Sequence, residues 1–227
     1  MEQDAIQFEH SLRAFAAQLS LSLPDSSIPY FSRYLSELKS WNRAINLTAI
    51  DQDIEIVVKH FIDSMAGVKV IENNGEMSVL DVGAGAGFPS LPLKFVLPDV
   101  PMVLLEPSEK RSSFLRYMIG SLGLPGMTVV TAKLENYVSR QDTVQIFDYI
   151  VVRAWKVEGR GLEIGKVLKP GGKAILYRAE KVGRGFELNC VLDHWDPFRV
   201  IVPRGTGRNS VRAFPSSVCR TTLTVSS

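Results

Sequence analysis

The apolar positions of this sequence follow two different periods, and the change from one to the other divides the chain. Up to about residue 75 they recur every three or four residues, which is the spacing of amphipathic helices. This spacing predicts helices over Phe8–Leu19, Phe31–Ile45 and Ile54–Met65. The turn residues Asn73–Gly75 then interrupt the pattern. We therefore expect an N-terminal helical extension over residues 1–75.

From Ser78 onward, short apolar runs alternate with helical segments. The expected strands are Ser78–Val82, Met102–Glu106, Met127–Thr131, Phe147–Val152 and Lys173–Tyr177, with weaker closing strands at Val200–Val202, Val211–Phe214 and Thr221–Val225. The expected helices are Pro89–Val96, Glu109–Leu122, Leu134–Ser139 and Gly161–Leu168. Such alternation is typical of βαβ units. It predicts an α/β core over residues 76–227, with a mostly parallel sheet covered by helices on both faces.

Composition is that of a folded globular protein. The chain has 227 residues, of which 45% are hydrophobic and 22% are charged. Its apolar runs fall far short of the ~20 residues that span a bilayer, and its acidic, polar N-terminus is unlike a signal peptide. The two cysteines, Cys190 and Cys219, lack the spacing of metal ligands. We therefore expect a cytoplasmic, monomeric protein without a metal site or a membrane partner.

Charge is distributed unevenly along the chain. The formal net charge is +2, but residues 1–150 carry 12 basic and 18 acidic side chains, whereas residues 151–227 carry 14 and 6. The basic C-terminal third is either ordinary surface variation or a surface that faces a polyanion. The sequence contains no run of like charge that would decide between the two.

The sharpest local motif is the glycine-rich segment Val79–Pro89, which follows the first expected strand. It has the pattern D-x-G-x-G-x-G, formed by Asp81, Gly83, Gly85 and Gly87. Glycines let a ligand approach the backbone closely. Phe88 stands where a dinucleotide-binding motif has its third glycine, so a nicotinamide cofactor is disfavoured. The Asp81 carboxylate could pair with a cationic amine, which favours a nucleoside that carries an amino acid.

Two acidic positions extend this motif. Glu106 ends the second expected strand about 20 residues beyond the glycines, where a carboxylate can accept both hydroxyls of a ribose. Leu134 and Glu135 follow the third strand and could flank an adenine and accept from its amino group. Taken singly, these residues are equally compatible with a tight turn, a helix-start carboxylate and a core leucine. Taken together and in this order, they predict an S-adenosylmethionine site.

The sequence also resembles a known family, the RsmG (GidB) family of 16S ribosomal RNA guanine-N7 methyltransferases. The resemblance runs from about Phe31 to Tyr177. It rests on five motifs: Trp41-Asn42-x-x-x-Asn46-Leu47-Thr48-Ala49-Ile50, His60-Phe61-x-Asp63-Ser64, the loop Asp81–Pro89, Lys110-Arg111-x-x-Phe114-Leu115, and Phe147-Asp148 leading to Arg153-Ala154. It implies a class I methyltransferase fold, Rossmann-like and preceded by a helical extension. The implied substrate is 16S ribosomal RNA, either free or in a small ribosomal subunit particle.

The resemblance also implies which residues contact the S-adenosylmethionine. By position these are Gly83, Phe88, Leu134, Glu135 and Arg153. Glu106 stands where the family usually has Asp, and Ser90 stands where it has Gly. Arg153 is the candidate for a positioning role, through the donor's carboxylate or guanine O6; the alternative is an ion pair with Asp148 or Glu158.

Several expectations concern residues outside the cofactor motif. Lys110 and Arg111 begin a helix, where positive charge opposes the helix dipole, so they are either RNA-phosphate contacts or a solvated helix flank. His60 is expected to be a hydrogen-bonded structural histidine. Asp63 and Asn46 are expected to hold the helical extension against the glycine loop.

The residues at the strand ends limit which atom of the RNA can receive the methyl group. Cytosine C5 needs a cysteine nucleophile, and exocyclic adenine amines are usually served by a Pro-Pro-aromatic turn after the fourth strand. This chain has Val151-Val152-Arg153-Ala154-Trp155 there. Guanine N7 already carries a lone pair, so it needs no general base. The alternatives left open are a methyltransferase for a small molecule or a protein, and a nucleotide-binding module without catalysis.

Overall fold

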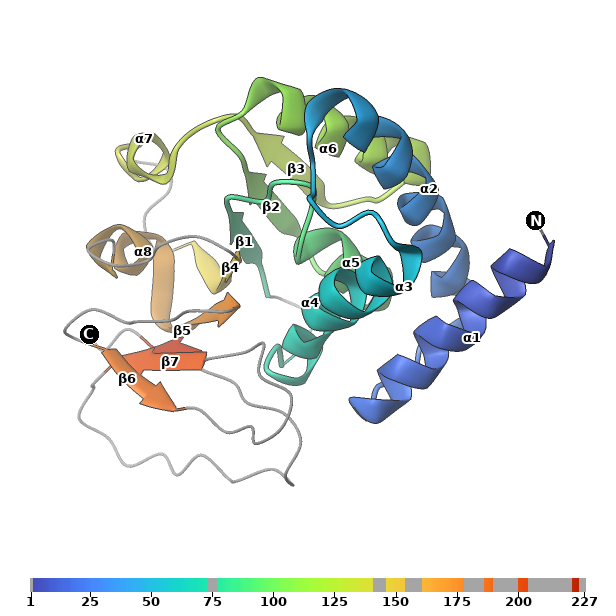
Figure 1. Cartoon of the computed structure of the whole chain (residues 1–227). Helices are drawn as coiled ribbons and strands as arrows, with labels where there is room; N and C mark the ends of the chain where they lie inside the picture. Colours follow the sequence, from blue (N-terminus) through green and yellow to red (C-terminus); the bar gives the residue numbers. More distant parts are fainter. Residues whose placement is uncertain are drawn as a thin grey trace.

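The computed structural model of the chain describes residues 2–72, 77–140, 146–153, 161–177, 186–189, 200–203 and 222–224. Figure 1 shows a twisted main sheet with helices packed against it and a second, two-stranded sheet. Among them, no helix combines the length and the apolar character that are needed to cross a bilayer.

The helical extension is present as the apolar spacing predicts. Its elements are α1 (Glu2–Gln18), η1 (Asp25–Ser27), α2 (Ile28–Ile45), α3 (Asp53–Ile56), η2 (Val57–Ile62), α4 (Asp63–Met65) and η3 (Ala66–Lys69). Pro29 lies in the first turn of α2, where its missing N–H costs no hydrogen bond. Segment η2 is a π-helix. The 3.6-residue period did not predict this wider turn, which is frequent at functional sites.

The main sheet contains the five strands that the alternating pattern predicts. They are β1 (Val79–Val82), β2 (Met102–Leu105), β3 (Met127–Val130), β4 (Phe147–Arg153) and β5 (Leu168–Tyr177). The strand order is β3-β2-β1-β4-β5-β8, in which β8 (Thr222–Thr224) is antiparallel to β5 and the other neighbours are parallel. Leu168 belongs to a strand and not to the predicted helix, because it pairs with Phe147.

The closing region is described only in part. Strands β6 (Phe186–Asn189) and β7 (Val200–Pro203) form a separate antiparallel pair. The sequence predicted β7 but not β6. The candidate strand Val211–Phe214 lies outside the described residues.

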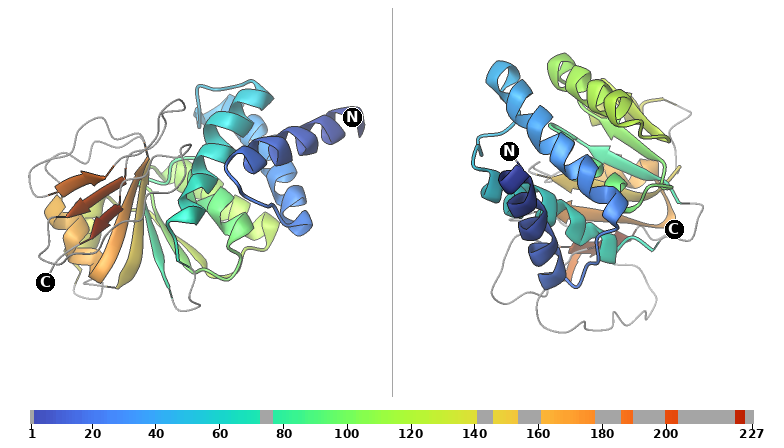
Figure 2. Two further views of the ribbon diagram at one scale, coloured as in Figure 1. Left: turned by 90° about the horizontal axis from the view of Figure 1, so that it is seen from below. Right: turned by 90° about the vertical axis from the view of Figure 1, so that its right-hand side faces the viewer.

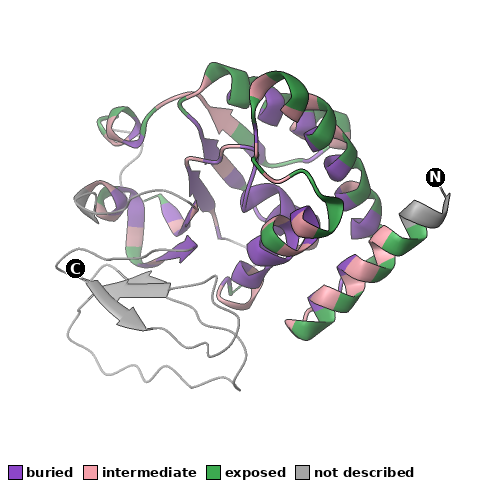
Figure 3. Cartoon of the chain, in the orientation of Figure 1, coloured by how far each residue is buried: buried purple, intermediate pink, exposed green. Residues whose placement is uncertain are grey.

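Alternate strand residues face two different hydrophobic clusters, as expected for a sheet covered on both faces. Val79, Leu104 and Val151 pack with the helical extension, with α5 (Ser90–Val96) and with α6 (Glu109–Leu122). Their neighbours Leu80, Leu105 and Val152 pack with α7 (Leu134–Val138) and α8 (Gly161–Val167). Figure 2 shows the extension gathered on one side of the sheet, and Figure 3 shows the buried strands between the two layers.

A cluster of aromatic rings joins the extension to the glycine-rich segment. Tyr34 of α2 and Phe61 of η2 are fully buried, and their ring centroids lie 5.3 Å apart. Both rings contact Phe88, at 5.2 Å and 6.1 Å. The Tyr34 hydroxyl donates a hydrogen bond of 2.6 Å to the carbonyl oxygen of Ala86. The extension and the glycine loop therefore share one core.

Replacing Tyr34 by Phe tests the polar part of this junction. The Tyr34→Phe variant leaves the buried carbonyl of Ala86 without its donor, so we expect the free energy of unfolding to fall by ~1–3 kcal/mol. Tyr30→Phe is the matched control, because the half-buried Tyr30 ring stacks on Phe95 and its hydroxyl makes no hydrogen bond within the described chain. Urea denaturation of both variants measures the difference. Equal losses would contradict a role for the Tyr34 hydroxyl.

Candidate functional site

The predicted cofactor residues lie at the carboxyl ends of neighbouring strands. Strands β1 and β4 are adjacent, and the chain continues from them toward opposite edges of the sheet. In open α/β sheets, ligands bind outside the carboxyl ends of the strands at such a switch point. We call the group formed by Asp81, residues 83–89, Glu106 and Arg153 the strand-end site. It contains all the predicted cofactor contacts except Leu134 and Glu135.

The three glycines of the loop have left-handed backbone conformations, with φ of 75° at Gly83, 58° at Gly85 and 98° at Gly87. A side chain would be strained at each of them. A Cβ atom at Gly87 would also lie 2.5 Å from Cδ1 of Leu91, so this glycine is required for the packing of α5. No described atom lies within 4 Å of a Cβ built at Gly83. The open backbone at Gly83 fits the predicted close approach of a ligand.

Glu106 holds the glycine loop against the end of β2. Its carboxylate is almost fully buried, and it accepts one hydrogen bond of 2.8 Å from Gly85 N–H and another of 2.8 Å from Ser108 N–H. Each carboxylate oxygen has a second lone pair, so these bonds leave acceptor capacity for hydroxyl groups. The predicted ribose contact therefore fits the geometry, and it stays a prediction.

Asp81 is a buried carboxylate with one satisfied oxygen. Oδ2 accepts hydrogen bonds from Ser90 Oγ at 2.6 Å and from Ser90 N–H at 3.3 Å. Oδ1 is buried and has no hydrogen-bond partner within the described chain. Burial raises the pKa of Asp81 to about 7, although the bonds from Ser90 act in the opposite direction. A ligand's ammonium group would fit the unused oxygen and would stabilise the ionised carboxylate.

The contact with Ser90 was not predicted. The resemblance marked Ser90 only as a departure from the family pattern, which has glycine there. The structure gives its hydroxyl a partner in Asp81. A serine two residues after Phe88 carries no signal of its own, because the contact depends on how the loop folds back over β1.

Arg153 ends β4, and its ion-pair partner differs from those considered. Asp63 Oδ2 accepts from Nε at 3.0 Å and lies 2.9 Å from Nη2. Asp148 instead accepts from Lys169 and from Ser78, so the alternative of an Arg153–Asp148 pair is wrong. The other considered partner, Glu158, lies outside the described residues.

Two further groups of the extension contact the Arg153 side chain. The carbonyl of Lys59 accepts a hydrogen bond from Nη2, which also lies 3.0 Å from Nδ1 of His60. The guanidinium lies 5.5 Å from the centre of the Phe88 ring, within the range of a cation–π contact. His60 is hydrogen-bonded as expected. Asp63 was expected to hold the extension against the glycine loop, whereas its ion pair joins the extension to the end of β4.

Leu134 and Glu135 begin α7 on the opposite face of the sheet. Leu134 is 3% exposed and packs in the same cluster as Val82 and Leu105, which end β1 and β2. Glu135 is partly buried. The burial of Leu134 agrees with the alternative in which it is a leucine of the hydrophobic core. The proposed adenine contact stays a prediction.

Lys110 and Arg111 lie in the first turn of α6, immediately after the segment that holds Glu106. Both side chains are exposed, and neither makes a hydrogen bond or an ion pair within the described chain. They are available to a solvent-borne anion next to the strand-end site. No cluster of three or more potential metal ligands occurs among the described residues.

Residues 27–190 match the family described as rRNA small subunit methyltransferase G. The chain belongs to this family. Its curated members include a ribosomal RNA small subunit methyltransferase G of Carboxydothermus hydrogenoformans, which is 35% identical over 77% of this chain and 74% of its own length. The namesake from Desulforamulus reducens is 35% identical over 63% of this chain. That match spans only 60% of the Desulforamulus protein, less than two thirds of its length.

A solved structure supports the fold independently. A proposed O-methyltransferase of Klebsiella pneumoniae superposes with a TM-score of 0.51 over 70% of this chain and 68% of its own, at 18% identity. The chain therefore has the predicted class I methyltransferase fold, which is Rossmann-like with a mostly parallel sheet.

The raised pKa of Asp81 predicts a pH-dependent stability. The native carboxyl keeps its proton up to about pH 7, whereas the unfolded one loses it near its usual 3.8. Its contribution to stability is therefore fully present below the unfolded pKa and is lost as pH rises through the folded pKa. At 1.36 kcal/mol per unit, the shift corresponds to about 4 kcal/mol. We expect Asp81→Asn to remove this decline, measured by urea denaturation from pH 4 to pH 8.

Ser90→Ala provides the companion measurement. The Ser90 hydroxyl lowers the pKa of Asp81, so its removal should raise that pKa further and extend the decline to higher pH. If the free energy of unfolding of the wild type changed with pH in the same way as that of Asp81→Asn, the prediction that the native Asp81 carboxyl stays protonated up to about pH 7 would be wrong.

Proposed function

We propose that this chain is an S-adenosylmethionine-dependent methyltransferase that modifies N7 of a guanine in small-subunit (16S) ribosomal RNA. The observation that carries the proposal is the family match over residues 27–190, a segment that contains the whole strand-end site. The unused Oδ1 of Asp81 and the open backbone at Gly83 support a ligand there. The predicted division into an extension (1–75) and a methyltransferase core (76–227) is part of this proposal.

Five residues of the strand-end site hold the donor in this proposal. When bound, S-adenosylmethionine supplies an electrophilic methyl group on a sulfonium. Gly83 and Gly85 allow the close approach of the backbone, and Glu106 accepts from the ribose hydroxyls. Asp81 accepts from the donor's ammonium group, and Arg153 donates to its carboxylate. Leu134 and Glu135 flank the adenine. Catalysis then consists mainly of positioning donor and acceptor in line.

The choice of guanine N7 rests on the acceptor's own chemistry. N7 is a lone-pair acceptor, so no side chain has to remove a proton before transfer. In the sequence, Cys190 and Cys219 lie well beyond the ends of β1–β4, and β4 leads into Arg153-Ala154-Trp155 with no Pro-Pro-aromatic turn. An RNA substrate and the small number of cysteines fit the cytoplasm, and we include a monomeric state in the proposal.

The decisive experiment follows the methyl group to its product. The protein is incubated with labelled S-adenosylmethionine and, separately, with ribosomal RNA, small ribosomal subunits and a protein mixture. We expect label in RNA or in the subunits. Because N7 methylation makes the imidazole ring cationic and prone to opening, borohydride and aniline should then break the RNA at one position.

The other outcomes separate the parts of the proposal. Label in protein alone would favour the alternative function, a methyltransferase for a protein or a small molecule. Finding N6-methyladenine or a ribose methyl group, without chain cleavage, would retain the donor and overturn the acceptor.

The exposed pair at the start of α6 predicts a salt-dependent contribution to RNA binding. Removing both charges, as Lys110→Ala with Arg111→Ala, should weaken RNA binding and reduce the slope of log K against log salt by ~1–2, because fewer counterions are released. Fluorescence anisotropy across a salt series measures this slope. Lys166→Ala is the matched control, since Lys166 is exposed on α8 at the opposite face of the sheet. An unchanged slope would show that Lys110 and Arg111 do not contact RNA phosphate and are only a solvated flank of the helix.

A further inference from the structure

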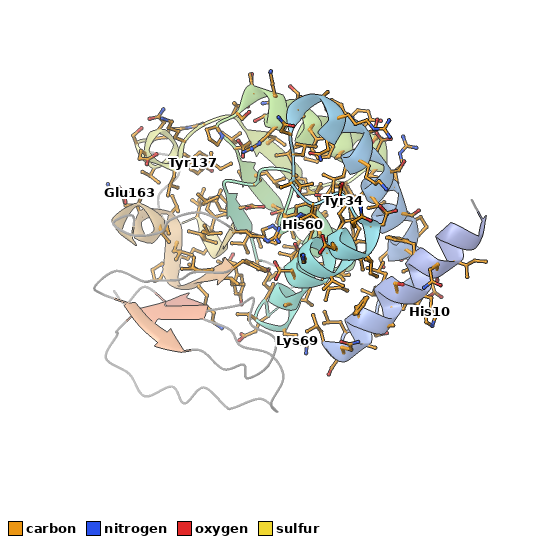
Figure 4. All side chains as sticks on the ribbon, viewed as in Figure 1. His10, Tyr34, His60, Lys69, Tyr137 and Glu163 are labelled. Atoms are coloured by element: carbon orange, nitrogen blue, oxygen red, sulfur yellow. The ribbon has the colours of Figure 1, made fainter. Side chains whose placement is uncertain are left out.

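His60 lies between the helical extension and the end of β4. It is part of the π-helix η2, and Figure 4 shows it near the centre of the molecule, whereas His10 lies out on α1. Nδ1 of His60 is 3.0 Å from Nη2 of Arg153, and Nε2 is 2.8 Å from Oγ1 of Thr48. Both ring nitrogens therefore lie within hydrogen-bond distance of a polar group.

The chemistry of these partners determines where the imidazole carries its proton. A guanidinium has only donors, so Nδ1 of His60 must accept from Arg153. The ring hydrogen is then on Nε2 and is donated to Thr48 Oγ1, which also accepts from Ile50 N–H at 3.1 Å. A doubly protonated ring would place two cations in contact and lose the bond to Arg153. The contacts select the neutral ring with its hydrogen on Nε2.

Thr48 is itself held in place by Asn42. The Asn42 side chain accepts from Leu47 N–H at 2.6 Å and from Thr48 N–H at 2.8 Å, and it donates to the carbonyl of Thr48 at 2.9 Å. Thr48, which accepts from the His60 ring, thus lies in a loop that is held by three hydrogen bonds to the Asn42 side chain. This connects the Trp41–Ile50 motif to Arg153 through defined hydrogen bonds.

On the other side, His60 acts on groups of the strand-end site. Its ring stacks on Phe88, with centroids 4.5 Å apart and planes 23° apart. Nε and Nη2 of Arg153 are used by Asp63, Lys59 and His60, whereas Nη1 has no hydrogen-bond partner within the described chain. The contacts of the extension therefore orient the guanidinium and leave one amino group for a ligand.

We propose that His60 is a positioning residue for methyl transfer: its neutral ring accepts from Arg153 and orients Nη1 toward the carboxylate of the methyl donor. The proposal rests on the proposed function, because it assigns the ligand of Arg153 to the donor. His60 itself touches neither donor nor acceptor in this assignment. Its effect passes through Arg153.

Two amide substitutions separate the two nitrogens of the ring. His60→Asn places an amide near the position of Nδ1 and can still accept from Arg153. His60→Gln places its amide near the position of Nε2 and retains only the contact with Thr48. Both lose the stacked ring and each loses one of the two hydrogen bonds, so their difference compares the bond to Arg153 with the bond to Thr48. By calorimetry with S-adenosylhomocysteine, we expect His60→Gln to bind ~5–10-fold more weakly than His60→Asn, as for the loss of one hydrogen bond of ordinary strength. His10→Gln, far from the site, should bind like the wild type.

A double-mutant cycle tests whether the effect passes through Arg153. Arg153→Lys keeps a cation beside Asp63 but lacks Nη1, so in that background the two His60 variants should bind S-adenosylhomocysteine equally. A difference that persists there, or no difference beside the native Arg153, would overturn the proposal. Thermal unfolding of all variants checks that the differences in affinity do not follow stability, and affinities that did follow it would also overturn the proposal.

The same measurements distinguish this proposal from the proposed function. If the wild type does not bind S-adenosylhomocysteine, the proposed function fails and the role of His60 fails with it. If binding shows the expected difference while RNA stays unmethylated, the role of His60 is supported and only the acceptor assignment fails.

Discussion

The ion pair between Arg153 and Asp63 is the contact on which the geometry of the strand-end site depends. The two side chains are 9% and 1% exposed, and they join the end of β4 to the helical extension. Taking two charges out of water is costly, and further hydrogen bonds to the charged groups offset part of that cost. The carbonyl of Lys59 and the ring of His60 supply further acceptors to Arg153. Loss of one partner would leave a buried charge, a change that typically costs ~3–5 kcal/mol.

The aromatic cluster makes the extension part of the site. In a doubly wound sheet, the loop after the first strand usually rests on the helix that follows it. Here Phe88 also packs on Tyr34 and His60, and the Tyr34 hydroxyl binds the loop carbonyl of Ala86. The extension therefore restrains both sides of the switch point, the loop after β1 and the arginine that ends β4. A change in the packing of α2 or η2 would therefore alter the geometry of the strand-end site, even if the changed residue does not contact a ligand.

Electrostatics at the site match a ligand that carries both signs of charge. Burial and the nearby Glu106 raise the pKa of Asp81, while Arg153 lowers it. The carboxyl is thus balanced between its neutral and ionised forms near neutral pH, and a cationic group beside Oδ1 would select the ionised form. Arg153 offers the complementary partner for an anion. An amino-acid moiety, with an ammonium and a carboxylate, satisfies both, which is the physical reason for favouring S-adenosylmethionine over a plain nucleotide.

The sequence by itself determined the layers of the fold and the order of the cofactor motifs. Apolar spacing reflects which face of an element is buried, so it predicted the helices before residue 70 and the strands β1–β5. The glycines and Glu106 were found because a strand, a tight turn and a helix follow one another locally. Only the tertiary structure decided that Arg153 pairs with Asp63, 90 residues away, and that Ser90 binds Asp81. From the sequence, the candidate ion-pair partners of Arg153 were Asp148 and Glu158, and Asp63 was not among them. Whether Arg153 pairs with Asp63 or with Asp148 depends on how the extension packs across the sheet. No local sequence pattern encodes this packing, because the two partners are far apart along the chain.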